Sequence, residues 1–169
     1  NKAQKVNGWI PDESSNPANP NFHFKTTGPE IWRDLQGKVG AVISAPGTGG
    51  AITGIGRYLK SQNSKVQVVL AGKVNSPFLR YIKSKNKKEQ DEISLPAVFD
   101  AKLIHDAFPI PPEEALRLQA DLYDKEGIFA GLTTGTVIAG ALRFSETIKD
   151  TLANERDPFN IVILSPDRD

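Results

Sequence analysis

The 169-residue chain contains no cysteine and no methionine. Without cysteine it can form neither a disulfide nor a thiolate metal site, and nothing in it suggests secretion. Only His23 and His105 could supply imidazole ligands, so we predict no metal site. Methionine is missing even at position 1, and residues 1–5 read as the last turns of a helix. We therefore interpret the sequence as a piece of a longer chain.

An excess of one charge and a long apolar run are also lacking. The 21 basic and 20 acidic residues give a net charge of +1, which argues against nucleic acid or an anionic membrane as the main partner. No apolar run approaches the ~20 residues that span a bilayer, and no segment resembles a signal peptide. We therefore expect a cytoplasmic protein. With 38% apolar residues, the chain can bury the core of one domain, residues 1–169.

Short apolar runs alternate with segments of helical periodicity. The runs predict strands over residues 39–45, 66–71, 101–108 and 160–164. The periodic segments predict helices over residues 51–61, 77–83, 111–126 and 134–148. By contrast, we expect loops at the proline-rich residues 11–30 and at the charge run 83–94. This alternation predicts an α/β fold with a mainly parallel sheet flanked by helices, and ligands at the carboxyl ends of its strands.

A glycine-rich loop, residues 45–51 (APGTGGA), joins the first predicted strand to a helix. Its glycines leave backbone amides uncovered, the helix start adds a positive dipole end, and Thr48 offers a hydroxyl. These features favour a phosphate site, although a tight turn that needs positive φ explains the glycines equally well. Neither the dinucleotide motif nor the ATP loop matches, because Ile52 replaces a glycine and no Gly-Lys-Ser/Thr follows.

The threonines Thr133 and Thr134 stand at a second strand-to-helix junction. Threonine is a favoured N-cap, so helix capping is the simpler interpretation of this pair. The alternative is that one hydroxyl faces a ligand. The chain has no Gly-x-Ser-x-Gly motif and no cysteine nucleophile, and the spacing of His23 and His105 to carboxylates supports no acid–base pair.

Taken together, these segments resemble cysteine synthase (O-acetylserine sulfhydrylase) and, less closely, cystathionine β-synthase. The resemblance rests on residues 16–20 (NPANP), 25–32 (KTTGPEIW), 47–50 (GTGG), 53–59 (TGIGRYL), 126–131 (EGIFAG) and 160–164 (NIVIL). It implies the C-terminal half of a fold type II (tryptophan synthase β-like) enzyme that uses pyridoxal 5'-phosphate. The N-terminal half of that family is absent from this sequence.

The resemblance also implies roles for particular residues. The cofactor phosphate would lie on the glycine loop, formed by Gly47, Thr48, Gly49 and Gly50. Thr133 would face the pyridine nitrogen, which suits β-replacement chemistry. The implied activity is that of a transferase or lyase of cysteine biosynthesis, converting O-acetylserine and sulfide to cysteine and acetate. A homodimer is implied, and so is a partner, the C-terminal peptide of serine acetyltransferase.

The chain also departs from the family at functional positions. The lysine that binds the cofactor and the loop that binds the substrate carboxylate have no counterpart, so we predict no catalytic residue in this chain and no activity of the chain alone. Ala51 replaces the last threonine of the phosphate loop. Glu13 replaces a glutamine near the substrate carboxylate, where like charges would repel, and is our one candidate for substrate binding. The glycine-rich loop that closes over the cofactor is missing around residues 88–95.

Two hypotheses follow. The chain is part of an active cysteine-synthase-like enzyme, or it is a diverged, inactive paralogue that serves as an interaction or regulatory module. The presence of a lysine motif upstream of Asn1 would distinguish them, because only the enzyme needs it.

Overall fold

The computed structural model describes residues 7–152 and 158–167, so the helix end predicted at residues 1–5 lies outside the described residues. Its centre is a four-stranded sheet of order β3-β2-β1-β4 in which every pairing is parallel. The strands are β1 (Ala41–Ser44), β2 (Gln67–Lys73), β3 (Asp106–Ile110) and β4 (Ile161–Ile163). The predicted parallel sheet is therefore confirmed.

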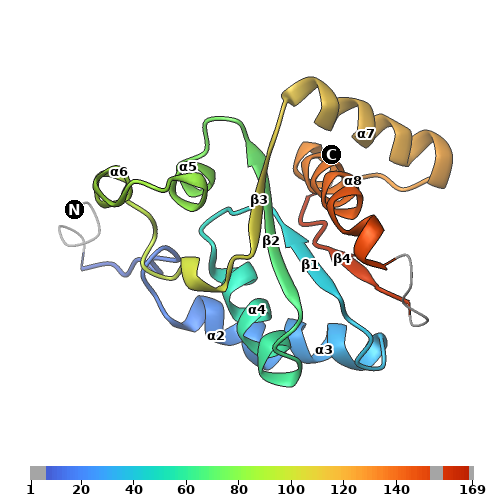
Figure 1. Cartoon of the computed structure of the whole chain (residues 1–169). Helices are drawn as coiled ribbons and strands as arrows, with labels where there is room; N and C mark the ends of the chain where they lie inside the picture. Colours follow the sequence, from blue (N-terminus) through green and yellow to red (C-terminus); the bar gives the residue numbers. More distant parts are fainter. Residues whose placement is uncertain (1–6, 153–157, 168–169) are drawn as a thin grey trace.

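The helices connect these strands in two directions from β1. They are α2 (Ala18–Lys25), α3 (Thr27–Asp34), α4 (Gly50–Gln62), α5 (Pro77–Lys83), α6 (Lys87–Glu92), α7 (Pro112–Glu126) and α8 (Leu132–Leu152), with a 3-10 turn η1 (Ala101–Leu103). The chain runs outward from β1 to β2 and β3, and then returns past β1 to β4. Right-handed crossovers in opposite directions must cover opposite faces. Figure 1 shows the result, with α7 and α8 on one side of the sheet and α2, α3 and α4 on the other.

The core consists of two apolar layers, one on each face of the sheet. Because side chains alternate along a strand, Val42 and Leu70 join the layer beneath α4, while Ile43 and Val69 join the layer beneath α8. Apolar residues at helical spacing are buried against the same faces: Ile52, Ile55, Leu59, Ala115, Leu118, Val137 and Phe144. Leu122 and Ala141, on the same helix faces, are only partly buried. Both layers are therefore filled by residues whose spacing is visible in the sequence.

The prediction of a loop at residues 11–30 was wrong from residue 18 onward, because that part forms α2 and the start of α3, whereas residues 11–17 lie outside the helices. Three prolines of the region mark helix starts: Pro17 is the N-cap of α2, and Pro20 and Pro29 lie in the first turns. Proline is tolerated there because the first amides of a helix have no intrahelical acceptor. Gly28 lets α3 approach α4, since a Cβ at this position would lie 2.7 Å from Tyr58 Cβ.

Two further boundaries differ from the prediction. The charge run forms α6, capped by Asn86, whose side chain accepts a hydrogen bond from Lys88 N, and α6 has no buried residue. The strand predicted at residues 101–108 begins at Asp106, because η1 precedes it. It contains Pro109, which lacks a backbone N–H, and β3 accordingly lies at the edge of the sheet.

Replacing Gly54 with alanine should destabilise the fold. Alanine gains about 1 kcal/mol in helix propensity. However, its Cβ would lie 2.1 Å from the Pro20 carbonyl oxygen, which is backbone and cannot rotate away. Overpacking of this kind costs about 1–3 kcal/mol, so the clash should exceed the gain. Urea unfolding followed by circular dichroism measures the difference. Ser61→Ala, on the exposed end of α4, is the control, and an unchanged midpoint for Gly54→Ala would contradict the packing argument.

Candidate functional site

A cavity of about 600 Å³ opens at the carboxyl ends of β1, β2 and β3. The glycine loop, the start of α5 and the first turn of α8 surround it, and its lining includes Gly47, Lys73, Phe78, Thr133 and Thr136. Its lining is mostly apolar. In doubly wound sheets, ligands bind at this edge where the strand order reverses, as it does at β1. The cavity is therefore the candidate site.

The glycine loop turns the chain from β1 into α4 with two positive φ angles, +51° at Gly47 and +84° at Gly49. The loop is also closely packed. A Cβ at Gly49 would lie 2.6 Å from the Phe99 ring, and a Cβ at Gly50 would lie 2.2 Å from Asn19 Oδ1. At Gly47, by contrast, no atom lies within 4 Å of the added Cβ among the residues described. Glycine is thus required by contacts at two positions, and the third opens the backbone to the cavity.

The start of α4 offers hydrogen-bond donors to an anion. Gly49 N donates to Pro46 O, and Thr53 N donates to Gly49 O. Within residues 7–152 and 158–167, the amides of Ala51 and Ile52 have no acceptor, as expected in the first turn of a helix. The first turn of α4 contains no acidic residue that would compensate the dipole. This helix start is therefore suited to a phosphate group.

Asn19 holds the glycine loop from behind. Its side-chain Nδ2 donates to Glu13 O at 2.9 Å and to Thr48 Oγ1 at 3.2 Å. The same Thr48 oxygen also accepts a long, 3.5 Å bond from Gly50 N. Because both bonds use the oxygen as acceptor, the Thr48 hydroxyl keeps its own hydrogen for another partner. Asn19, the second asparagine of the NPANP motif, therefore connects that motif to the glycine loop.

The start of α8 differs, because the chain itself provides its anion. The Asp167 carboxylate accepts bonds from Thr133 N at 2.7 Å, Thr134 N at 3.1 Å and Thr134 Oγ1 at 2.7 Å. Partial burial raises the pKa of Asp167, but hydrogen bonds from the hydroxyls and amides of Thr134 and Thr133 outweigh it, and the pKa lies below its ordinary value. The dipole of α8 is thus already compensated, whereas that of α4 is not.

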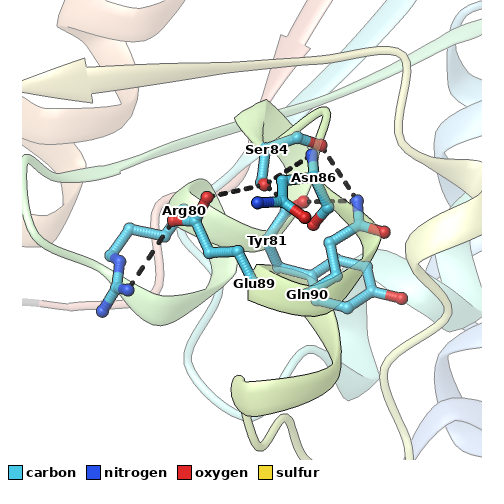
Figure 2. A network of polar contacts seen from close by, with 6 residues as sticks. All are labelled: Arg80, Tyr81, Ser84, Asn86, Glu89 and Gln90. Carbon is cyan, nitrogen blue, oxygen red and sulfur yellow. Dashed lines mark hydrogen bonds and ion pairs between the residues drawn. The ribbon is translucent and has the colours of Figure 1, made fainter.

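The start of α5 also borders the cavity, and polar contacts connect α5 to α6. Figure 2 shows this network, in which Gln90 Nε2 donates to the carbonyls of Tyr81 and Ser84, both at 3.0 Å. Glu89 accepts a 2.8 Å bond from Ser84 Oγ and lies 3.8 Å from Arg80. Residues 83–95 contain no glycine. A short, capped helix therefore occupies the stretch in which the family resemblance implies a closing glycine-rich loop.

The structure distributes the predicted site residues as follows. Gly47, in the glycine loop, and Thr133, in the first turn of α8, both line the cavity, while Thr48, Gly49 and Gly50 belong to the loop but are not among the lining residues. Glu13 is exposed on the segment before α2 and does not line the cavity. The roles assigned to all six stay predictions.

Sequence reasoning missed Asn19, Lys73 and Asp167 as site residues. Asn19 had a usable signal, because it belongs to a motif already recognised as specific. Lys73 is the last residue of β2 and Asp167 follows β4, so both lie at the carboxyl ends of strands, where a parallel sheet binds ligands. Which of the residues at these strand ends reach the cavity or a helix start depends on the three-dimensional packing.

At the level of class, the molecule is a parallel α/β domain with a glycine-rich strand-to-helix loop at its switch point. The family model described as "Pyridoxal-phosphate dependent enzyme" matches residues 1–163. The chain therefore belongs to this family of pyridoxal-phosphate-dependent enzymes. The cofactor of the family is pyridoxal 5'-phosphate.

Individual relatives support the same family assignment. Cysteine synthase A of Escherichia coli (strain K12) is 37% identical over 162 residues, which cover 90% of this chain and 48% of the relative. Cysteine synthase B of the same strain is 32% identical over 150 residues, covering 89% and 48%. A crystal structure of a hydrogen sulfide-producing enzyme from Fusobacterium nucleatum superposes with a TM-score of 0.81 at 29% identity, over 99% of this chain and 56% of that one. The chain thus spans about half the length of its curated relatives.

The described residues suit the phosphate group of this cofactor. The loop offers unengaged amides at Ala51 and Ile52, a free hydroxyl hydrogen at Thr48 and an open backbone at Gly47. Among the residues that the structure describes, no cluster of three or more His, Cys, Asp or Glu could hold a metal ion, and none of the helices is sufficiently long and apolar to cross a membrane.

Removing the Asp167 carboxylate should loosen the start of α8 in a pH-dependent way. Because the folded pKa lies below the ordinary 3.8, the carboxylate stabilises the fold above that pH and loses this effect as the pH falls through the folded value. Asp167→Ala should cost about 1 kcal/mol at pH 7, as loss of a helix cap does. Asp124→Ala, on the exposed face of α7, is the control. Denaturant midpoints measured from pH 7 to pH 3 should converge for Asp167→Ala and wild type. A constant difference would contradict the capping role.

Proposed function

We propose that this chain is the cofactor-phosphate-binding half of a cysteine-synthase-like enzyme that converts O-acetylserine and sulfide to cysteine and acetate. The observation that carries the proposal is the glycine loop, whose donors at Thr48, Ala51 and Ile52 are not engaged among the described residues and whose Gly47 lines a cavity at the switch point of the sheet. Similarity to cysteine synthases A and B supports the substrate class. The predicted single domain of residues 1–169, as the C-terminal half of the family fold, belongs to the same proposal.

In this proposal the chain binds and orients the cofactor. Bound pyridoxal phosphate supplies the electron sink for elimination and replacement at the β-carbon of the substrate. The amides of Ala51 and Ile52 and the hydroxyl of Thr48 donate to the phosphate oxygens. The apolar lining of the cavity excludes water from the ring, which strengthens these bonds.

Thr133 is proposed to face the ring nitrogen from the other side of the cavity. A neutral hydroxyl that donates to this nitrogen leaves it unprotonated. The hydroxyl also helps to hold the pKa of Asp167 below its ordinary value, so the proposal has it turn from the carboxylate to the ring when the cofactor binds. Asp167 can release it, because the carboxylate keeps the amide bonds of Thr133 and Thr134.

The reacting lysine and the substrate-carboxylate loop are proposed to come from the half of the fold that this chain does not match. The chain alone should therefore bind cofactor without turning over substrate. The homodimer, the serine acetyltransferase peptide and the substrate role of Glu13 belong to the same proposal for the whole protein. If the phosphate site fails its test, the alternative of an inactive interaction module is favoured.

Cofactor binding can be tested with pyridoxine 5'-phosphate, which has the ring and phosphate but no aldehyde and so cannot condense with surface lysines. Isothermal titration should show binding to the wild-type chain. Thr48→Val should weaken it about tenfold, the effect of losing one hydrogen bond to a charged group. Thr147→Val, on α8 away from the cavity, should bind like wild type. Equal affinity for Thr48→Val and wild type would remove Thr48 from the site.

The activity itself requires the longest natural form of the protein. Cysteine formation from O-acetylserine and sulfide should appear in the presence of pyridoxal phosphate and should fall in Thr48→Val. A longest natural form that binds the cofactor analogue but forms no cysteine would disprove the proposed reaction while leaving the phosphate site intact.

A further inference from the structure

Lys73 is the single charged residue among those that line the cavity in the described part of the chain. It is the last residue of β2, at the carboxyl edge of the sheet, and it is exposed. The remaining lining residues are apolar or neutral polar, and no carboxylate is among them. The cavity therefore carries one positive charge that its own walls do not compensate.

The side chain of Lys73 also has no acidic partner within residues 7–152 and 158–167. Nearby lysines behave differently: Lys83 pairs with Asp106 at 2.6 Å, and Lys87 pairs with Asp91 at 3.1 Å. An ammonium group beside a mostly apolar cavity attracts an anionic occupant, since the low-dielectric wall strengthens the interaction. The part of the ligand that lies near β2 should therefore be negatively charged.

The strand register places Lys73 beside the glycine loop. Ser44 of β1 lies opposite Leu70 of β2. Gly47 and Lys73 each follow three residues later at the same edge, where both line the cavity, and neighbouring strands are about 4.8 Å apart. The contact continues beyond the paired residues, because a Cβ on Gly72 would lie 3.5 Å from Pro46 Cδ. A lysine side chain readily spans this separation.

We propose that Lys73 is a phosphate-binding residue that contacts, from β2, the same phosphate monoester that the glycine loop binds from α4. The proposal rests on the proposed function of the loop. Gly47 is the open side of the loop, so an ammonium group can reach a phosphate oxygen there without meeting a side chain. The charge-assisted bond also offsets the hydroxyl donor that is missing at Ala51.

The test compares Lys73→Gln with Lys73→Arg and with Lys65→Gln, a control lysine in the loop before β2, at the opposite end of the sheet. Isothermal titration uses three probes: pyridoxine 5'-phosphate, pyridoxine and inorganic phosphate. Lys73→Gln should weaken the binding of pyridoxine 5'-phosphate and of inorganic phosphate about fivefold, an effect between those of exposed and buried ion pairs. The affinity for pyridoxine should not change. Lys73→Arg should retain wild-type affinity. Wild-type affinity should fall more steeply with salt than that of Lys73→Gln.

Three results would overturn the assignment. Unchanged affinity of Lys73→Gln for both phosphate probes would show that Lys73 does not contact the phosphate. An equal loss of affinity for pyridoxine would show that the substitution disturbs the cavity as a whole rather than an ionic contact to phosphate. If the wild-type chain binds pyridoxine 5'-phosphate no better than pyridoxine, the glycine loop does not bind phosphate, and the proposed function is wrong as well. The first two results leave the proposed function standing.

Discussion

Parallel pairing of β1 on both of its sides is the constraint on which the site depends. Because β2 and β4 run parallel to β1, all three strands end at one edge of the sheet. Right-handed crossovers then place α4 and α8 on opposite faces, with both helix starts at that edge. Between β1 and α4 the chain has only residues 45–49 for its reversal. Positive φ at Gly47 and Gly49 accomplishes the turn and leaves the helix amides facing outward.

The two helix starts at this edge have opposite electrostatic roles. At α8 the Asp167 carboxylate already occupies the positive end of the dipole, and its depressed pKa reflects the donors that surround it. At α4 no acidic residue stands in the first turn, while Asn19 and Phe99 support the loop from behind. This difference is why we propose α4, and not α8, as the helix start that binds an external anion. The uncompensated charge of Lys73 beside Gly47 acts in the same direction.

Much of this architecture was predictable because short-range patterns determine it. The apolar runs at residues 39–45 and 66–71 contain β1 and most of β2, and the start of α7 and its glycine cap at Gly127, with φ +68°, follow from local chemistry. The glycine pattern marked residues 45–51 as a possible phosphate loop, and the family resemblance assigned the cofactor phosphate to it. The same local reading failed at residues 18–30, where prolines signal both loops and helix starts, and at α6, whose exposed residues show no apolar face.

By itself, the sequence determined the fold class, the order of its elements and the loop suited to phosphate, since these depend on periodicity, glycine positions and motif identity. Only the tertiary structure decided which distant residues share the site. Asn19 meets Thr48 because α2 packs on α4, with Gly54 against the Pro20 carbonyl, and Asp167 meets Thr133 because β4 ends beside the start of α8. Lys73 reaches the cavity through the register of β1 and β2. The two hydrogen-bonded pairs, Asn19 with Thr48 and Thr133 with Asp167, are 29 and 34 positions apart, and no local pattern encodes such contacts.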